Sequence, residues 1–176
     1  MRYFISWAFV LLIIMASHSA HAEHAVGLEN YFKTPPVKIG FGKYFYKDVI
    51  HAYNAILYSE DGKYDANKIF AIELIYKMEI DGDDIADKTI EQMNKTEKID
   101  KTKADAWDEQ LKAIMPDVED GTHLIGVNMP GEGVIFLQNG KAIGEIKDTD
   151  FARRFFASWL SPNAPDQDLR LGLLGR

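Results

Sequence analysis

The spacing of apolar residues changes several times along the chain, and each change marks the border of a predicted element. From Val37 to about Ser59 the sequence is rich in Tyr, Phe, Ile and Val, which predicts two strands. After a turn at residues 60–63, the run from Ile69 to Glu79 alternates between two sides. Its apolar side consists of Phe70, Ile72, Leu74, Tyr76 and Met78. The alternation predicts a half-buried strand with one strongly apolar face.

A helical period begins after this strand. Asp81 or Asp83 can cap a helix, and the apolar positions that follow fall on one stripe, formed by Ile85, Ala86, Thr89, Ile90 and Met93. The charged residues 94–103 predict a solvated connection. A second helix, with Trp107 and Leu111 on its apolar face, ends at Pro116 because proline cannot continue a helix.

The strand pattern returns in residues 123–128, 134–138 and 141–146. Asn139-Gly140 is a strong signal for a tight hairpin between the last two strands. Asp148 then caps a helix that closes at Ser161-Pro162, and a last helix spans roughly Asp166 to Leu174. Strands and helices occur in separate groups, so we expect an α+β domain with a mainly antiparallel sheet and helices on one face.

The first 22 residues follow the order of a cleaved signal peptide. Arg2 precedes an apolar run from Phe4 to Ala16, and small residues then lead to Ala20-His21-Ala22, which predicts cleavage before Glu23. A membrane anchor is the alternative, but a run of about thirteen residues is shorter than the roughly 20 that span a bilayer. We therefore expect a periplasmic or secreted protein with no stable membrane insertion after cleavage.

Composition bounds the function of the remaining chain. Residues 23–36 end in Thr34-Pro35-Pro36, which predicts an extended lead-in, and residues 37–176 are long enough for one domain with its own core. The chain has no cysteine, so it has no disulfide. Its formal charge is −7, and loss of residues 1–22 would leave 19 basic and 27 acidic residues. This acidity argues against a nucleic-acid partner and against binding to anionic membranes.

Motifs for metal and cofactor chemistry are incomplete. After residue 22 the histidines are His24, His51 and His123, and none has the spacing of a zinc site. A calcium loop that started at Asp81 would need glycine at Ala86. Without a thiol or a nucleophile-elbow serine, covalent catalysis has no support. We therefore expect neither a metal nor a cofactor.

Tyrosines are concentrated on the predicted strands, at positions 44, 46, 53, 58 and 76. The default interpretation is that they are core residues with local hydrogen bonds. The functional alternative is a cleft between sheet and helices, in which tyrosine hydroxyls and Lys43 contact the polar end of an apolar ligand. The candidate ligand-binding residues are Lys43, Tyr46, Tyr53 and Tyr76.

Several segments, in order along most of the chain, carry a further signal. They are Gly40-Phe41-Gly42-Lys43, DVIHAYNAILY (48–58), Ala71-Ile72-Glu73-Leu74, GDDIADKTIEQM (82–93), Met115-Pro116-Asp117-Val118, Leu124-Ile125-Gly126-Val127, Asn139-Gly140-Lys141 and DFARRFFASWLSP (150–162). Together they resemble the bacterial, periplasmic branch of the chalcone isomerase-like family. The resemblance implies an open-faced sandwich with a ligand cleft between its large antiparallel sheet and its layer of helices. Relatives in this family cyclise chalcones without a cofactor or bind fatty acids in the cleft.

At two positions that the resemblance matches, this chain departs from the pattern of the family. Family members use an arginine on an early strand and a tyrosine at the opening of the first helix, and these positions correspond here to Lys43 and Ile85. Lysine keeps the positive charge but lacks the planar fork of arginine. Ile85 has no hydroxyl to donate a proton to a substrate. We therefore expect no chalcone isomerase activity.

These observations favour a non-catalytic binding or carrier protein for a small amphipathic molecule, such as a fatty acid, with Lys43 near its anionic end. A cofactor-independent isomerase or lyase with a rearranged site, using Lys43, Tyr46 or Tyr53 as acid or base, is the alternative. A third hypothesis is an interaction protein whose cleft is filled by its own side chains. The large residues Trp107, Phe155, Phe156 and Trp159 are expected in the core under all three.

Overall fold

A computed structural model describes residues 27–176 of the chain. The predicted signal peptide and the start of the lead-in lie outside these residues. The elements, in chain order, are η1 (Leu28–Asn30), β1 (Val37–Tyr46), β2 (Ile50–Ser59), β3 (Phe70–Tyr76), α1 (Gly82–Thr96), α2 (Lys101–Lys112), β4 (His123–Met129), β5 (Gly133–Gln138), β6 (Lys141–Ile146), α3 (Thr149–Leu160) and α4 (Gln167–Leu173).

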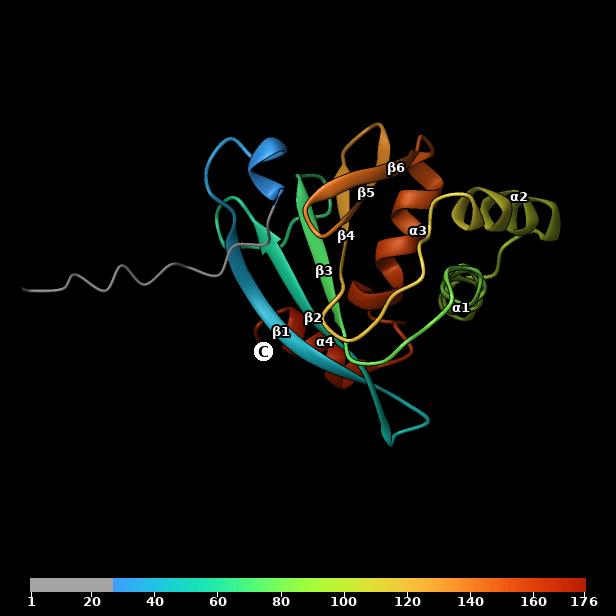
Figure 1. Ribbon diagram of the computed structural model, residues 1–176. Coiled ribbons are helices and arrows are strands. Elements are labelled where there is room, and N and C mark those ends of the chain that lie inside the picture. Colours follow the sequence, from blue (N-terminus) through green and yellow to red (C-terminus); the bar gives the residue numbers. More distant parts are fainter. Residues whose placement is uncertain (1–26) are drawn as a thin grey trace, which may run out of the picture.

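The six strands form one antiparallel sheet in the order β1-β2-β3-β4-β5-β6. Short connections join β1 to β2, β2 to β3, β4 to β5 and β5 to β6, whereas the connection from β3 to β4 contains α1 and α2. Helix α3 contacts β5 and α4 contacts β1, while α1 packs on α2 and α3. Figure 1 shows α1, α2 and α3 together on one side of the sheet. The predicted α+β open-faced sandwich is confirmed.

The connection between the first two helices is shorter than the sequence predicts. Instead of residues 94–103, it covers residues 97–100, since α1 continues to Thr96 and α2 begins at Lys101. The Asp100 carboxylate caps α2 by accepting hydrogen bonds from the backbone N–H groups of Thr102 and Lys103. Lys95, Lys101 and Lys103 of this stretch therefore lie on the exposed sides of the two helices.

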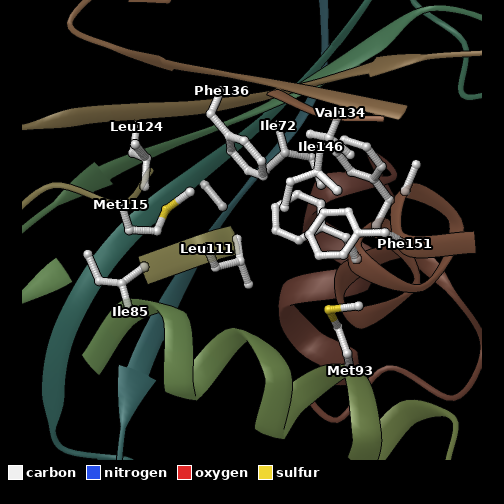
Figure 2. Close-up of a cluster of buried hydrophobic side chains, with 14 of the residues drawn as sticks. Ile72, Ile85, Met93, Leu111, Met115, Leu124, Val134, Phe136, Ile146 and Phe151 are labelled. Atoms are coloured by element: carbon white, nitrogen blue, oxygen red, sulfur yellow. The ribbon is translucent and has the colours of Figure 1, made fainter. Parts of the chain in front are cut away.

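The main core lies between the sheet and the helices. Figure 2 shows Ile85 and Met93 on α1 directed toward the sheet, with Leu124 and Phe136 on the opposite side of the same space. The aromatic side chains of α3 pack on one another, with Phe151 and Phe155 stacked at 5.6 Å between ring centroids. Trp107, Phe155 and Phe156 are buried, as expected from the sequence. Trp159 is only partly buried.

The second face of β3 is also buried, and the expectation of a half-buried strand is wrong over this segment. Ala71 and Glu73 are 0% and 2% exposed. Leu28 and Phe32 of the lead-in pack over this face of the sheet and form a second apolar cluster there. The buried Glu73 carboxylate accepts a hydrogen bond from the Tyr58 hydroxyl at 3.0 Å and lies 2.6 Å from His123 Nδ1. Residues 27–36 of the lead-in, which include the short helix η1, therefore belong to the folded domain.

Helix α4 approaches the first strand so closely that its position depends on a glycine. A Cβ atom at Gly40 would lie 2.2 Å from the carbonyl oxygen of Gly172 and 2.3 Å from that of Leu173. A side chain at position 40 is therefore incompatible with the end of α4 at this distance. Among residues 27–176, no helix is long and apolar enough to cross a membrane.

Candidate functional site

A cleft of about 1210 Å³ lies between the inner face of the sheet and three helices. Its walls come from β1 to β5, from the first half of α1, from the C-terminal half of α3 and from the start of α4. The apolar part of the lining includes Ile72, Leu74, Met115, Leu124, Phe136 and Phe155. Small-molecule sites in proteins are commonly apolar clefts of roughly 300–1,000 Å³ with a few polar groups. The cleft is therefore large enough to hold a small molecule.

A row of three tyrosines crosses the sheet side of the cleft. The strand register places Tyr44 opposite Tyr53, and Tyr53 opposite Tyr76. The Tyr44 and Tyr53 rings stack at 4.9 Å between centroids, and the Tyr53 and Tyr76 rings meet edge to face at 5.8 Å. The indole Nε1–H of Trp159 donates a hydrogen bond of 3.3 Å to the Tyr53 hydroxyl from the helix side. These contacts hold the tyrosine rings in place at the cleft wall.

The tyrosines of this row stay protonated near neutral pH. Burial raises the pKa of the Tyr53 and Tyr76 hydroxyls because the charged phenolate is poorly solvated there. The pKa of Tyr44 is also raised, first by burial and then by the Asp166 carboxylate. All three side chains can therefore act as O–H donors to a ligand.

One of these hydroxyls is unused. Tyr76 is only 3% exposed, and its side chain lines the cleft. Within residues 27–176, no protein group makes a hydrogen bond to the Tyr76 hydroxyl. The hydroxyl oxygen is not fully enclosed by protein, so it is accessible from the cleft, where water or a ligand can bind it. The lining therefore offers a free donor in a largely apolar space.

Charged residues surround the mouth of the cleft. The cations that line it are Lys43, Lys47 and Lys88, and the carboxylates are Asp48, Glu79, Asp81, Asp84, Asp166 and Asp168. The Nζ atoms of Lys47 and Lys88 lie 5.1 and 6.0 Å from the centroid of the Tyr46 ring. Lys88 also forms an ion pair with Glu91, which lowers the pKa of that carboxyl to about 2 together with Lys95. Tyr46 therefore lies at a mouth where two lysine side chains meet.

The four candidate residues from the sequence all line the cleft, but in different ways. Tyr53 and Tyr76 lie in the tyrosine row, and Tyr46 lies at the mouth. Lys43 is exposed, and its neighbours Gly42 and Tyr44 face α4 and Tyr53. Because successive strand residues point to opposite faces, the Lys43 side chain starts from the outer face of the sheet. Lys43 can contact the cleft only at its rim.

Three residues at the site, Tyr44, Trp159 and Lys88, were not among the candidates. Tyr44 was noted as one of the strand tyrosines, and its place follows from the alternation that also contains Tyr46. Trp159 was expected to be core, but it lies on the same helical stripe as Phe155, at the end that opens into the cleft. The sequence signal for Lys88 is weaker, because its position depends on how α1 lies over the sheet.

The described residues give no indication of a metal centre. Between residues 27 and 176 no group of three or more His, Asp or Glu side chains could hold a metal ion. The tyrosine row and Trp159 instead offer hydroxyl groups and an indole N–H to the cleft. This set is suited to neutral hydrogen bonding.

A family profile described as chalcone isomerase-like matches residues 40–175. The chain belongs to the chalcone isomerase-like family. No curated protein matches it in sequence. A solved structure with the same fold is a fatty-acid binding protein from Arabidopsis thaliana, with a TM-score of 0.63 and 12% identity over 80% of this chain and 87% of the plant chain. At this identity the likeness establishes the fold alone.

Within the chalcone isomerase-like fold, the two departures expected from the sequence lie at the cleft. Ile85 occupies the first turn of α1, is 8% exposed and lines the cleft. An apolar side chain therefore stands where the resemblance places a tyrosine. Lys43, which the resemblance matches to the arginine of the family, starts from the outer face of β1. The hydroxyls of Tyr53 and Tyr76 are the donors that remain inside.

Proposed function

We propose that this protein is an exported, non-catalytic binding or carrier protein for a small amphipathic molecule held between the sheet and the helices. The observation that carries the proposal is the free Tyr76 hydroxyl in a largely apolar cleft of about 1210 Å³. A ligand with one oxygen acceptor and an apolar body satisfies both features. The open volume argues against the hypothesis of a cleft that is filled by its own side chains.

The polar end of the ligand binds at the tyrosine row. Tyr76 donates to a carbonyl or carboxyl oxygen, and Tyr53 can donate its own proton while it accepts from Trp159. A fatty acid is one such molecule, and the plant protein with this fold is described as a fatty-acid binding protein. If the ligand is an anion, Lys88 and Lys47 at the mouth are better placed than Lys43 to compensate its charge.

The apolar body of the ligand supplies most of the affinity. Side chains such as Leu124, Phe136 and Phe155 line the cleft from strand and helix. Burying one methylene group contributes about 0.8 kcal/mol, so an acyl chain of moderate length can bind with few polar contacts. Affinity should therefore rise with chain length until the cleft is full.

An isomerase or lyase with a rearranged site is the second candidate. It is favoured by the protonated tyrosines, because a raised pKa keeps Tyr53 and Tyr76 available as general acids. A cofactor-independent reaction of this kind would give a pH-rate profile that falls at high pH, where the tyrosines lose their protons. Turnover of chalcone above the spontaneous rate, lost in Tyr76→Phe, would support this candidate against the carrier.

Native mass spectrometry of the gently purified protein, followed by organic extraction, tests the binding proposal. We expect a co-purified amphiphile. In titrations with palmitate we expect Tyr76→Phe to weaken binding about tenfold, because one hydrogen bond to the ligand is lost. Tyr64→Phe is the matched control, since Tyr64 does not line the cleft. Equal affinity of the two variants would overturn the role of Tyr76. The measured mass also tests cleavage before Glu23.

A further inference from the structure

The hairpin formed by β1 and β2 carries most of the exposed apolar side chains. Among residues 27–176, the large apolar residues that are exposed are Val37, Phe41, Phe45, Val49, Ile50 and Leu171. Four of them lie within residues 41–50, and Val49 is 77% exposed. Side chains of this kind are ordinary when scattered singly, but a group on one projecting element marks an interaction site.

The hairpin tip is a defined structure. Lys47 and Asp48 have φ values of 50° and 60°, and the Val49 N–H donates to the Tyr46 carbonyl oxygen at 3.3 Å. These features describe a tight two-residue turn, which matches the twist of the strands on either side. Figure 1 shows this end of the β1–β2 hairpin extending beyond the other elements. The apolar side chains at the tip are therefore presented away from the body of the protein.

The charge of the hairpin differs from that of the whole chain. Residues 37–51 contain three lysines, at positions 38, 43 and 47, and a single acidic residue, Asp48, while the chain carries a formal charge of −7. The net charge predicts repulsion from an anionic membrane, but charge near a surface acts locally because salt screens it over about 10 Å. Lysines beside exposed Phe, Val and Ile side chains suit the interface of an anionic bilayer.

The hairpin is continuous with the mouth of the cleft. Residues 43–48 line the cleft on one side of the mouth. The carboxylates of the mouth lie mainly on other segments, at residues 79–84 and 166–168. If the protein binds lipid through the hairpin tip, the mouth of the cleft lies beside the bilayer surface. The basic side of the mouth then faces the lipid.

We propose that residues 41–50 form a docking element that binds reversibly to the surface of an anionic phospholipid bilayer. Val49, Phe45 and Phe41 enter the boundary between headgroups and acyl chains, and Lys43 and Lys47 contact the headgroups. This interaction goes beyond ligand binding in the cleft and does not require a ligand. It is peripheral, so it is compatible with a protein that has no stable membrane insertion.

Flotation of the purified protein with vesicles tests this inference, with vesicles of phosphatidylcholine alone and with about one third phosphatidylglycerol. We expect binding to the anionic vesicles, reduced about tenfold or more in the double variant Phe45→Ser/Val49→Ser. The matched control is Val37→Ser/Leu171→Ser, which removes two exposed apolar side chains outside residues 41–50 and should bind like the parent protein. Lys43→Gln/Lys47→Gln should lose most of the preference for phosphatidylglycerol.

Three results would overturn the proposal. The first is no vesicle binding by the parent protein, and the second is equal binding by the hairpin and control double variants. The third is a dimer or larger assembly that only the hairpin variant dissolves, because the apolar tip would then be a contact between protein chains. Circular dichroism of each variant shows whether it is folded. Protein stripped of lipid by organic extraction and refolded should still bind vesicles, so failure of the cleft proposal and failure of this one are distinguishable.

Discussion

The indole Nε1–H of Trp159 donates a 3.3 Å hydrogen bond to the hydroxyl of Tyr53, and this contact joins α3 to β2 across one wall of the cleft. Tyr53 is at the same time the middle ring of a row, stacked on Tyr44 and edge to face with Tyr76. One side chain therefore links the helix layer to three strands. The cleft keeps its width at this point because both layers are attached to the same ring.

Replacing Tyr53 by Phe should lower the free energy of unfolding by about 1 kcal/mol, the usual net contribution of such a hydrogen bond. The ring contacts remain in this variant, and only the acceptor of the Trp159 N–H is lost. Urea unfolding followed by circular dichroism measures the change. Tyr64→Phe is the control, since no side-chain hydrogen bond of Tyr64 is present in residues 27–176, and it should change stability by less than about 0.5 kcal/mol. A larger loss in Tyr64→Phe would contradict the assignment.

Replacing Gly40 by Ala should destabilise the protein by about 3 kcal/mol or displace α4, because the new methyl group would meet backbone oxygens that cannot rotate away. Gly42→Ala is a matched comparison on the same strand. Its Cβ would approach the Cδ1 atom of Leu169 at 2.6 Å, and this side chain can move. We expect a smaller loss, about 1 kcal/mol. Thermal unfolding and protease cleavage near residue 166 give the two readouts, and equal effects would show that α4 adjusts freely.

The ion-pair group around Asp150 should make stability depend on pH in the acid range. Lys103, Arg153 and Arg154 hydrogen-bond the Asp150 carboxylate and hold its pKa well below the usual range. A depressed pKa in the folded state stabilises the protein above the unfolded value of about 4, and this contribution is lost as pH falls. The urea concentration at the midpoint of unfolding should therefore change less between about pH 4 and pH 2 in Asp150→Asn than in the parent protein.

The size of this effect is limited by solvent. The Asp150 side chain is 32% exposed, and its partners Lys103 and Arg153 are more exposed still, so we expect a loss of about 1 kcal/mol or less at neutral pH in Asp150→Asn. Asp105→Asn is the control, because Asp105 pairs with Lys101 alone among residues 27–176. The Lys101 side chain is 85% exposed, so this variant should have the same pH dependence as the parent protein. Identical pH profiles for the parent and Asp150→Asn would remove the linkage argument.

Local sequence patterns determined the elements of this protein. Periodicity of two identified the strands, periodicity near 3.6 identified the helices, and Asp100 and Asp148 behave as caps whose carboxylates accept backbone N–H groups. The connection between α1 and α2 was predicted too long, as residues 94–103 instead of 97–100, because charged side chains suit both a loop and the outer face of a helix. The alternation of side chains along β1 also predicts the orientation of Lys43, because Gly42 and Tyr44 lie on the opposite face of the strand.

Tertiary structure alone decided which surfaces are covered and which groups meet. Nothing in the pattern of β3 indicates that the lead-in residues Leu28 and Phe32 share an apolar cluster with Ala71, because this cluster joins segments about forty residues apart. The Trp159 to Tyr53 hydrogen bond spans 106 residues. Periodicity tells which residues share a face of one element. The partner of that face depends on packing between distant elements, where many weak contacts act together.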